Sequence, residues 1–157
     1  MKIEFWSLGK QHETYVLPGV EDFTSRIQHY FPVEWRIMMP KKSAVGNSAE
    51  KGKQQESALV IAALKPDDYL VALDENGKTF SSVKLARFIQ DRSNEPVKRL
   101  IFLIGGAYGL DENILSRAKF TWSLSALTFP HQLVRLILAE QIYRACSILR
   151  NGKYHHG

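Results

Sequence analysis

Short apolar runs alternate with amphipathic helical patterns along almost the whole chain, and this alternation limits the possible folds more than any other feature of the sequence. Short apolar runs and helical spacing of apolar residues are the signals that separate strands from helices. The runs that predict strands are Lys2–Leu8 and residues 33–39, 69–73, 100–104 and 120–124. The helical patterns cover residues 13–30, 49–64, 81–90, 111–118 and 130–149. The alternation predicts an α/β fold with a mostly parallel sheet and helices on both faces.

The composition fits one folded domain spanning residues 1–157. A chain of 157 residues with 45% hydrophobic and 24% charged residues can bury one substantial core. The formal net charge of +5 favours a polyanionic partner, although many basic proteins bind no nucleic acid. The single cysteine, Cys146, excludes an internal disulfide and a zinc site built from a cysteine cluster.

Targeting and membrane signals are not visible in the sequence. No apolar run approaches the roughly 20 residues that cross a bilayer. The first ten residues lack the apolar core of a signal peptide. We therefore expect a cytoplasmic protein without a membrane partner.

The helix predicted over residues 130–149 has two apolar sides. Pro130 suits a helix start because its missing N–H has no partner there, and the Thr128 hydroxyl is a candidate cap. One side carries Val134, Leu138, Ile142, Ala145 and Leu149, and the other carries Leu133, Ile137 and Ile148. A helix with two apolar sides is usually covered twice, so we expect a second copy of the chain to cover one of them. Arg135 falls within the first side and is either paired with a buried carboxylate or in contact with an anion or RNA.

Three loops are expected to meet at one edge of the sheet, because ligands of open α/β sheets bind beyond the carboxyl ends of the strands. These loops begin after Leu73, where the Asn76-Gly77 pair predicts a tight turn, and cover residues 105–109 and 124–129. The pair Gly105-Gly106 lets a ligand lie against bare backbone. Its continuation, G-G-A-Y-G, differs from the G-x-G-x-x-G fingerprint, and the chain has no phosphate-binding loop. A dinucleotide oxidoreductase and a nucleotide triphosphatase are therefore disfavoured.

The sequence shows no obvious nucleophile, metal site or acid–base pair. It has no G-x-S-x-G elbow, and its five histidines lack a metal-binding spacing. A glycine-floored cleft, a hydroxyl-lined loop and a basic surface suit a group-transfer enzyme whose cosubstrate is already activated. In such an enzyme, holding the donor and acceptor in line supplies much of the rate.

Several segments match one known family. They are M-K-I and L-G-K near the start, L-D-x-x-G-K from Leu73, L-I-G-G-x-x-G-L from Leu103, W-S-L-S-A-L-T-F-P-H-Q-L-V-R from Trp122, E-Q-I-Y-R-A from Glu140, and the closing Tyr154-His155. On these segments nearly the whole chain resembles the bacterial ribosomal RNA large subunit methyltransferase H family of the SPOUT class. Two departures are visible. Glu56-Ser57 stands where many members have Glu-Gly, at a position expected to lie far from the cofactor loops. Tyr108 replaces a residue that is often polar.

The resemblance implies a C-terminal trefoil knot at about residues 100–150, which is a rare exception among folds. It implies that the knot loops bind S-adenosylmethionine as cosubstrate in a bent form, with no metal. The residues that it assigns to this binding are Leu73, Gly105, Leu124, Ser125, Ala126, Leu127, Thr128 and Phe129. It further implies a homodimer, formed through the last helix, that methylates N3 of a pseudouridine in large-subunit (23S) ribosomal RNA within assembled ribosomes.

The acceptor nitrogen implied by this resemblance must lose a proton, so a base or a cation that favours the anion would assist transfer. The candidates are His131, Arg135, Arg144, Tyr154 and His155. His131 is either a neutral base or a packed structural residue. Arg144 either pairs with Glu140 one helical turn away or contacts RNA. Tyr154 either stacks on a base or belongs to a frayed tail.

Two further questions stay open from the sequence. The loop at residues 40–48, which contains Lys41 and Lys42, is either a basic flap or an ordinary solvated loop. The alternative function is a non-catalytic knotted factor that binds RNA or the ribosome. Such a factor would bind with strong salt dependence and would not consume S-adenosylmethionine.

Overall fold

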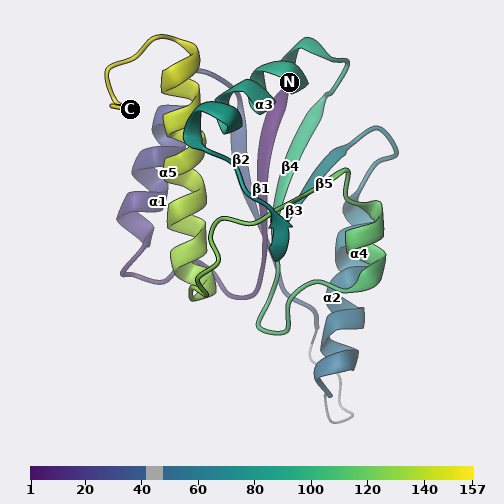
Figure 1. Cartoon of the computed structure of the whole chain (residues 1–157). Helices are drawn as coiled ribbons and strands as arrows, with labels where there is room; N and C mark the ends of the chain where they lie inside the picture. The colour runs from purple at the N-terminus through teal and green to yellow at the C-terminus, as the bar shows by residue number, and fades with distance from the viewer. Residues whose placement is uncertain (42–47) are drawn as a thin grey trace.

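The computed structural model describes residues 1–41 and 48–157, which form a parallel sheet with helices on both faces (Figure 1). The strands are β1 (Lys2–Leu8), β2 (Val33–Met38), β3 (Tyr69–Lys78), β4 (Arg99–Ile104) and β5 (Phe120–Trp122). The helices are α1 (Leu17–Ile27), α2 (Ala49–Ala63), α3 (Ser82–Asn94), α4 (Glu112–Arg117) and α5 (His131–Leu149). The strand order is β2-β1-β4-β3-β5, and each pairing between these strands is parallel. The α/β class predicted from the alternating pattern is confirmed.

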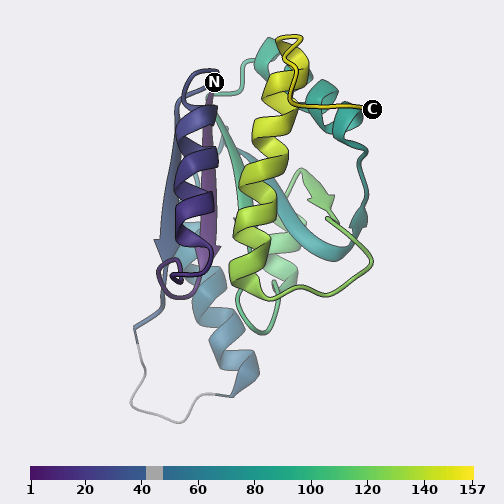
Figure 2. The same ribbon diagram turned by 90° about the vertical axis from the view of Figure 1, so that its left-hand side faces the viewer.

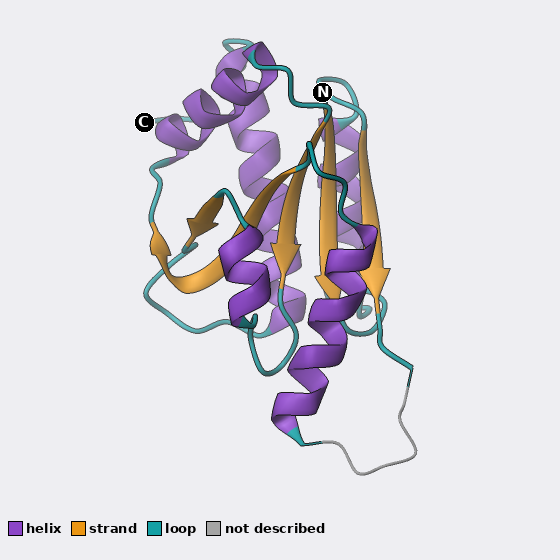
Figure 3. Ribbon diagram, turned by 90° about the vertical axis from the view of Figure 1, so that its right-hand side faces the viewer, coloured by secondary structure: helices purple, strands orange, loops and turns teal. Residues whose placement is uncertain are grey.

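Each face of the sheet has its own core, because successive strand residues point to opposite faces. On β1, Ile3 and Phe5 belong to the core that includes residues of α1, α3 and α5. Trp6 and Leu8 belong to the opposite core, which includes residues of α2 and α4. Figure 2 shows the face covered by α1 and α5, and Figure 3 shows α2 and α4 in front of the strands.

Local signals in the sequence set where the helices begin. The α1 helix begins at Leu17 with Pro18 in its first turn, where the missing proline N–H costs no hydrogen bond. Ser48, Ser81 and Asp111 precede α2, α3 and α4, and each side chain accepts a hydrogen bond from a backbone N–H of the first turn. These caps satisfy donors that have no partner within the helix.

The α5 helix contacts α1 and α3 on its face of the sheet (Figure 2). Its residues Leu138, Ile142 and Ala145 are fully buried, whereas residues of its other apolar side, such as Leu133, stay half-buried. No side chain caps its first turn, so the predicted Thr128 cap is wrong. Thr128 is exposed and lines a cavity instead. Neither α5 nor another helix of the described residues is sufficiently long and apolar to cross a membrane.

The β3 strand continues past Leu73 to Lys78, where the sequence predicted a tight turn at Asn76-Gly77. In β5, Trp122 pairs with both Leu73 and Lys78 across an irregularity in the ladder. A Cβ at Gly77 would lie 2.6 Å from the carbonyl oxygen of Thr121. Gly77 therefore permits a close backbone approach to β5. The predicted turn is wrong because β3 bends along its edge neighbour and does not reverse.

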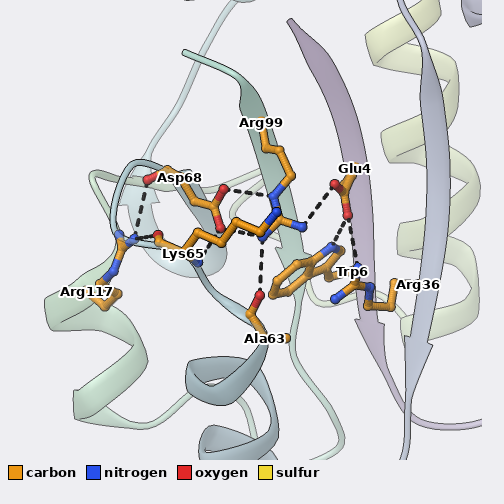
Figure 4. A network of polar contacts seen from close by, with 8 residues as sticks. All are labelled: Glu4, Trp6, Arg36, Ala63, Lys65, Asp68, Arg99 and Arg117. Carbon is orange, nitrogen blue, oxygen red and sulfur yellow. Dashed lines mark hydrogen bonds and ion pairs between the residues drawn. The ribbon is translucent and has the colours of Figure 1, made fainter. Parts of the chain in front are cut away.

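A network of ion pairs lies toward the amino ends of the strands, on the face covered by α2 and α4 (Figure 4). The carboxylate of Glu4 is 1% exposed and accepts a hydrogen bond of 3.0 Å from the Trp6 indole N–H. It lies 3.3 Å from Nη1 of Arg99 and 3.7 Å from Nη2 of Arg36. The same Arg99 guanidinium donates to both carboxylate oxygens of Asp68, with an Nε–Oδ1 distance of 2.8 Å.

The network fixes the segment that leads into β3. Burial raises the pKa of Asp68, but hydrogen bonds from Arg99 and from the Lys65 backbone N–H outweigh this effect and hold the pKa below its ordinary value of 3.8. Arg117 at the end of α4 donates to the Lys65 carbonyl at 2.9 Å (Figure 4). The start of β3 is thus tied to β1, β4 and α4.

Candidate active site

A cavity of about 270 Å³ opens at the carboxyl ends of β3, β4 and β5, beside the first turns of α5. The sequence analysis placed three loops at this edge, and all three contribute to the lining. The lining residues are Leu73, Asp74, Glu75, Ile104, Gly105, Gly106, Ala107, Gly109, Trp122, Leu124, Ser125, Leu127, Thr128, Phe129, His131 and Val134. The strand order explains the convergence, because β3 lies between β4 and β5.

Glycines form one wall of the cavity, and two of them leave little room for a side chain. A Cβ at Gly105 would lie 3.1 Å from the Leu110 side chain, and a Cβ at Gly106 would lie 2.6 Å from Oε1 of Glu56. Gly109 has a positive φ of 77°, and its N–H donates to the Gly106 carbonyl at 3.1 Å. The loop therefore presents bare backbone to the cavity.

The loop between β5 and α5 is shaped by its own hydroxyl groups. The buried Ser123 hydroxyl donates to the Ser125 carbonyl at 2.9 Å, and the Ser125 hydroxyl accepts from the Leu127 N–H at 3.0 Å. Trp122 is 3% exposed and packs edge-on against Phe102 of β4, which anchors the start of the loop. These contacts define the backbone that forms the second wall.

Two carboxylates lie at the cavity, on the irregular part of β3. Asp74 and Glu75 both line it, and the Asp74 side chain accepts a hydrogen bond from the Asn76 N–H at 3.2 Å. The sequence analysis named the loop after Leu73 but not these side chains. Their position directly after a buried strand was the available signal. Carboxylates here suit a ligand that carries an ammonium group.

The residues that the family resemblance assigned to the cosubstrate mostly lie together. Those that line the cavity are Leu73, Gly105, Leu124, Ser125, Leu127, Thr128 and Phe129. Ala126 belongs to the same loop but is exposed and does not contribute to the lining. His131 also lines the cavity, as the first residue of α5.

Arg135 lies beside the end of β1 and is only 1% exposed. Its Nε donates to the Ser7 hydroxyl at 2.9 Å, and its Nη1 lies 3.3 Å from Nδ1 of His12. Among the described residues, no carboxylate forms an ion pair with Arg135. The predicted carboxylate pair is therefore wrong, because the guanidinium uses neutral partners. A side chain this buried is also unavailable for the predicted contact with RNA.

The tail residues Tyr154 and His155 lie near the opposite end of α5 from the cavity. The Tyr154 hydroxyl donates to Oε1 of Glu140 at 3.0 Å, and Nη1 of Arg144 lies 3.2 Å from Nδ1 of His155. Arg144 also forms the predicted ion pair with Glu140, at 2.6 Å. Arg144 is thirteen positions after His131, so at about 1.5 Å per residue it lies about 20 Å along the helix from the cavity.

The tail is anchored rather than frayed. Tyr154 is half-buried, its ring lies 4.8 Å from the Tyr143 ring, and the Arg144 guanidinium lies 4.7 Å above it. Burial, followed by the hydrogen bond to Glu140, raises the pKa of the Tyr154 hydroxyl. The interpretation of the tail as frayed is therefore wrong.

Glu56 lies against the cavity wall, although the sequence analysis placed it far from the cofactor loops. Its carboxylate occupies the space that a side chain at Gly106 would need. The earlier expectation is wrong because α2 crosses beside the loop after β4, which a separation of 50 positions in the sequence does not reveal (Figure 3). No signal within the sequence itself indicated this contact.

The loop that contains Lys41 and Lys42 falls largely outside the described residues. Lys41 is exposed, and Lys42 is not described. The choice between a basic flap and a solvated loop therefore stays a prediction.

The cavity fits a small, partly charged organic ligand better than a metal. The described residues contain no group of three or more His, Cys, Asp or Glu side chains that could hold a metal ion. The cavity combines bare glycine backbone, apolar side chains such as Leu124, two hydroxyls and two carboxylates. S-adenosylmethionine has a flat base, ribose hydroxyls and an ammonium group, and this lining offers a matching surface for each.

Comparison with known proteins identifies the family. Residues 1–155 match the family model described as a predicted SPOUT methyltransferase. A relative from Cytophaga hutchinsonii is 39% identical over 156 residues, which cover 99% of this chain and 100% of the relative. A relative from Trichlorobacter lovleyi is 41% identical over the same length, with the same coverage. Both are named ribosomal RNA large subunit methyltransferase H.

The chain belongs to this family. The resemblance drawn from the sequence segments is therefore confirmed. A solved structure titled as a probable methylase family protein from Haemophilus influenzae Rd KW20 is also similar, with a TM-score of 0.55 and 10% identity. The match covers 99% of this chain and 70% of that one, and at this identity it supports the SPOUT-type fold alone.

Proposed function

We propose that this ribosomal RNA large subunit methyltransferase H family member transfers the methyl group of S-adenosylmethionine to N3 of a pseudouridine in 23S ribosomal RNA, within assembled cytoplasmic ribosomes. The observation that carries the proposal is the cavity at the carboxyl ends of β3, β4 and β5. All but one of the residues assigned to the cosubstrate by the family resemblance line it. The names of the relatives support ribosomal RNA as the acceptor.

The cavity lining suits methyl transfer from a charged donor. When bound, S-adenosylmethionine supplies a methyl group on a positively charged sulfonium. The backbone of Gly105 and Gly106 and apolar side chains such as Leu124 do not stabilise that charge, so its loss during transfer is not opposed. Asp74 and Glu75 are the lining residues suited to the donor's ammonium group.

The position of the tail supports a homodimer with composite sites. Tyr154 and His155 contact Glu140 and Arg144, which lie about 13 Å and 20 Å along α5 from His131, so the tail is remote from the cavity of its own chain. Two copies packed antiparallel along α5 would bring the tail of one copy to the cavity of the other. The half-buried apolar side of α5, which includes Leu133 and Ile137, would supply the contact between copies.

In such a dimer, the acceptor nitrogen would meet groups from both chains. His131 lines the cavity and can take the imide proton or orient the nucleobase. In the tail cluster, His155 can accept the proton, and Arg144 can favour the resulting anion. Tyr154 can stack on a nucleobase. Arg135 acts indirectly, by holding the first turns of α5 against the end of β1.

Methyl transfer is tested with labelled S-adenosylmethionine and two acceptors, assembled ribosomes and free ribosomal RNA. We expect label on ribosomes only, recovered as N3-methylated pseudouridine. Label on another nucleoside would contradict the assigned acceptor. No label together with no cosubstrate binding would favour the non-catalytic binding factor.

Mixed dimers test the composite site. His155→Ala removes the tail group, and Gly105→Val forces a side chain against Leu110 and the Gly109 backbone, which displaces the glycine wall of the cavity. Each variant is expected to lose transfer alone, and mixing them under conditions that exchange subunits is expected to restore part of it. Restoration requires that the tail and the cavity of one active site come from different chains. Absence of restoration, with exchange verified by mass spectrometry, would contradict that arrangement.

A further inference from the structure

Glu56 is half-buried, and one oxygen of its carboxylate is buried without the hydrogen bond that such an atom usually makes. Its Oε2 is inaccessible to solvent, and no group of the described residues forms a hydrogen bond with it. Buried carboxylate oxygens are rarely left in this condition, because desolvation without a partner is costly. Burial raises the pKa of Glu56, and a hydrogen bond from the Gly106 backbone N–H to the carboxylate offsets only part of this effect.

The carboxylate presses against the back of the cavity wall. A Cβ at Gly106 would lie 2.6 Å from Oε1, 2.7 Å from Oε2 and 3.0 Å from Cδ of Glu56, and the first two distances are shorter than real Cβ contacts. Gly106 itself lines the cavity. The glycine is thus in contact with the carboxylate on one side and contributes to the ligand surface on the other.

A second contact from α2 supports the same loop. A Cβ at Gly52 would lie 3.6 Å from the ring of Tyr108, which is ordinary van der Waals contact. Gly52 and Glu56 are four residues apart, so they lie on one face of α2. Val60, four residues further on, is fully buried in the core of that side of the sheet. One stripe of α2 therefore runs from the sheet core to the loop of residues 105–109 (Figure 3).

We propose that Glu56 is a positioning residue for the cosubstrate site: its carboxylate holds Gly106 so that the loop backbone keeps the shape that binds S-adenosylmethionine. The inference rests on the proposed function, because it concerns the same cavity. Glu56 does not line the cavity and acts through Gly106. The carboxylate stays in this position because α2 is anchored to the sheet core through Val60.

A double-mutant cycle on Glu56 and Gly106 tests the contact. S-adenosylmethionine affinity is measured by calorimetry for Glu56→Ala, Gly106→Ala and the double variant, and the thermal unfolding midpoint is measured for each. We expect each single variant to bind about tenfold more weakly, because one loses the support and the other places a methyl group against the carboxylate. In the Glu56→Ala background, adding Gly106→Ala is expected to cost less than about threefold, because the obstructing carboxylate is gone.

Two further variants separate positioning from general damage. Glu56→Gln keeps the volume and an acceptor oxygen, so it is expected to restore affinity to near the wild-type value. Glu50→Ala, an exposed residue in the first turn of the same helix, is the matched control and is expected to bind normally. In turnover assays Glu56→Ala should raise KM for S-adenosylmethionine while KM for ribosomes stays unchanged.

Additive losses in the cycle, or wild-type affinity in Glu56→Ala, would overturn the inference while leaving the proposed function intact. Failure of the wild-type protein to bind S-adenosylmethionine would overturn the proposed function and this inference with it. If Glu56→Ala does not fold, Glu56→Gln is compared with Gly106→Ala. Normal S-adenosylmethionine affinity in Glu56→Gln together with weaker affinity in Gly106→Ala supports the positioning role. A Gln variant as weak as Gly106→Ala refutes it.

Discussion

The carboxylates at the two ends of the sheet have opposite surroundings. At the amino ends, Glu4 and Asp68 are each bound by the Arg99 guanidinium, and the network is satisfied within the protein (Figure 4). At the carboxyl ends, Asp74 and Glu75 line an open cavity, and none of the ion pairs among the described residues includes them.

This difference separates a structural end from a functional end. Polar groups that satisfy one another leave nothing for a ligand, and they fix the chain in one arrangement. Polar groups arranged around a cavity are available to a ligand, and the protein gains less stability from them. The comparison predicts that substitutions at the amino ends change unfolding and that substitutions at the carboxyl ends change binding.

The largest expected effect is on Arg99 at the amino end. Arg99→Ala leaves two buried carboxylates without their shared cation and is expected to lower the free energy of unfolding by about 3–5 kcal/mol. Chemical denaturation measures this change. Lys2→Ala removes an exposed ion pair with Glu34 and, as the matched control, should cost less than about 1 kcal/mol. Equal losses of unfolding free energy in the two variants would contradict a stabilising role of the ion-pair network at the amino ends.

The next effect concerns Gly77, where β3 approaches β5 at the cavity edge. Gly77→Ala places a methyl group 2.6 Å from the Thr121 carbonyl oxygen, so one of the two backbones must move. We expect a loss of about 1–3 kcal/mol in the free energy of unfolding, together with weaker S-adenosylmethionine binding because Trp122 shifts. An unchanged free energy of unfolding would contradict this expectation, because it would show that the irregular part of β3 moves without losing stability.

A smaller effect depends on pH and on His12. Burial, and then the charge of Arg135, lower the pKa of His12 below its ordinary value of 6.5. The unfolded chain therefore takes up a proton near pH 6.5 that the folded chain takes up only at lower pH. The contribution of His12 to the free energy of unfolding is fully present above about pH 6.5 and is lost as pH falls through the pKa of His12 in the folded chain. Denaturation at several pH values should show this decrease in the wild type and a weaker one in His12→Gln. If the free energy of unfolding changed with pH in the same way in both proteins, His12 would not be the source of the decrease.

The smallest effect on stability is expected at Leu127, which lines the cavity and is 69% exposed. Leu127→Ala should change the free energy of unfolding by less than about 0.5 kcal/mol. It should still weaken S-adenosylmethionine binding several-fold, because an apolar part of the cavity wall is removed. Calorimetry checks the binding, and normal affinity would exclude Leu127 from the site.

The sequence predicted the elements of the fold better than their long-range contacts. Periodicity located the five strands, and the caps at Ser48, Ser81 and Asp111 are local signals. The turn predicted at Asn76-Gly77 was wrong because this pair occurs both in tight turns and where two strands approach closely. Nothing local showed that Arg99 would meet Glu4, 95 positions away.

The candidate site was predictable where one loop supplies it and not where separate elements meet. The run of residues 124–129 is continuous, so most of it was assigned correctly to one wall of the cavity. Contacts such as Glu56 with Gly106 and Arg135 with Ser7 join elements far apart in sequence, and residue types alone do not reveal them. The knot, the homodimer and the roles of the tail residues stay predictions.

The most direct test of the contrast between the two ends is S-adenosylmethionine binding, measured by calorimetry on the wild type, Gly105→Val and Arg99→Ala, at a temperature where all three are folded. The account predicts binding by the wild type and by Arg99→Ala, with loss in Gly105→Val. Binding that survives in Gly105→Val would place the cosubstrate elsewhere and contradict the assignment of the carboxyl-end cavity.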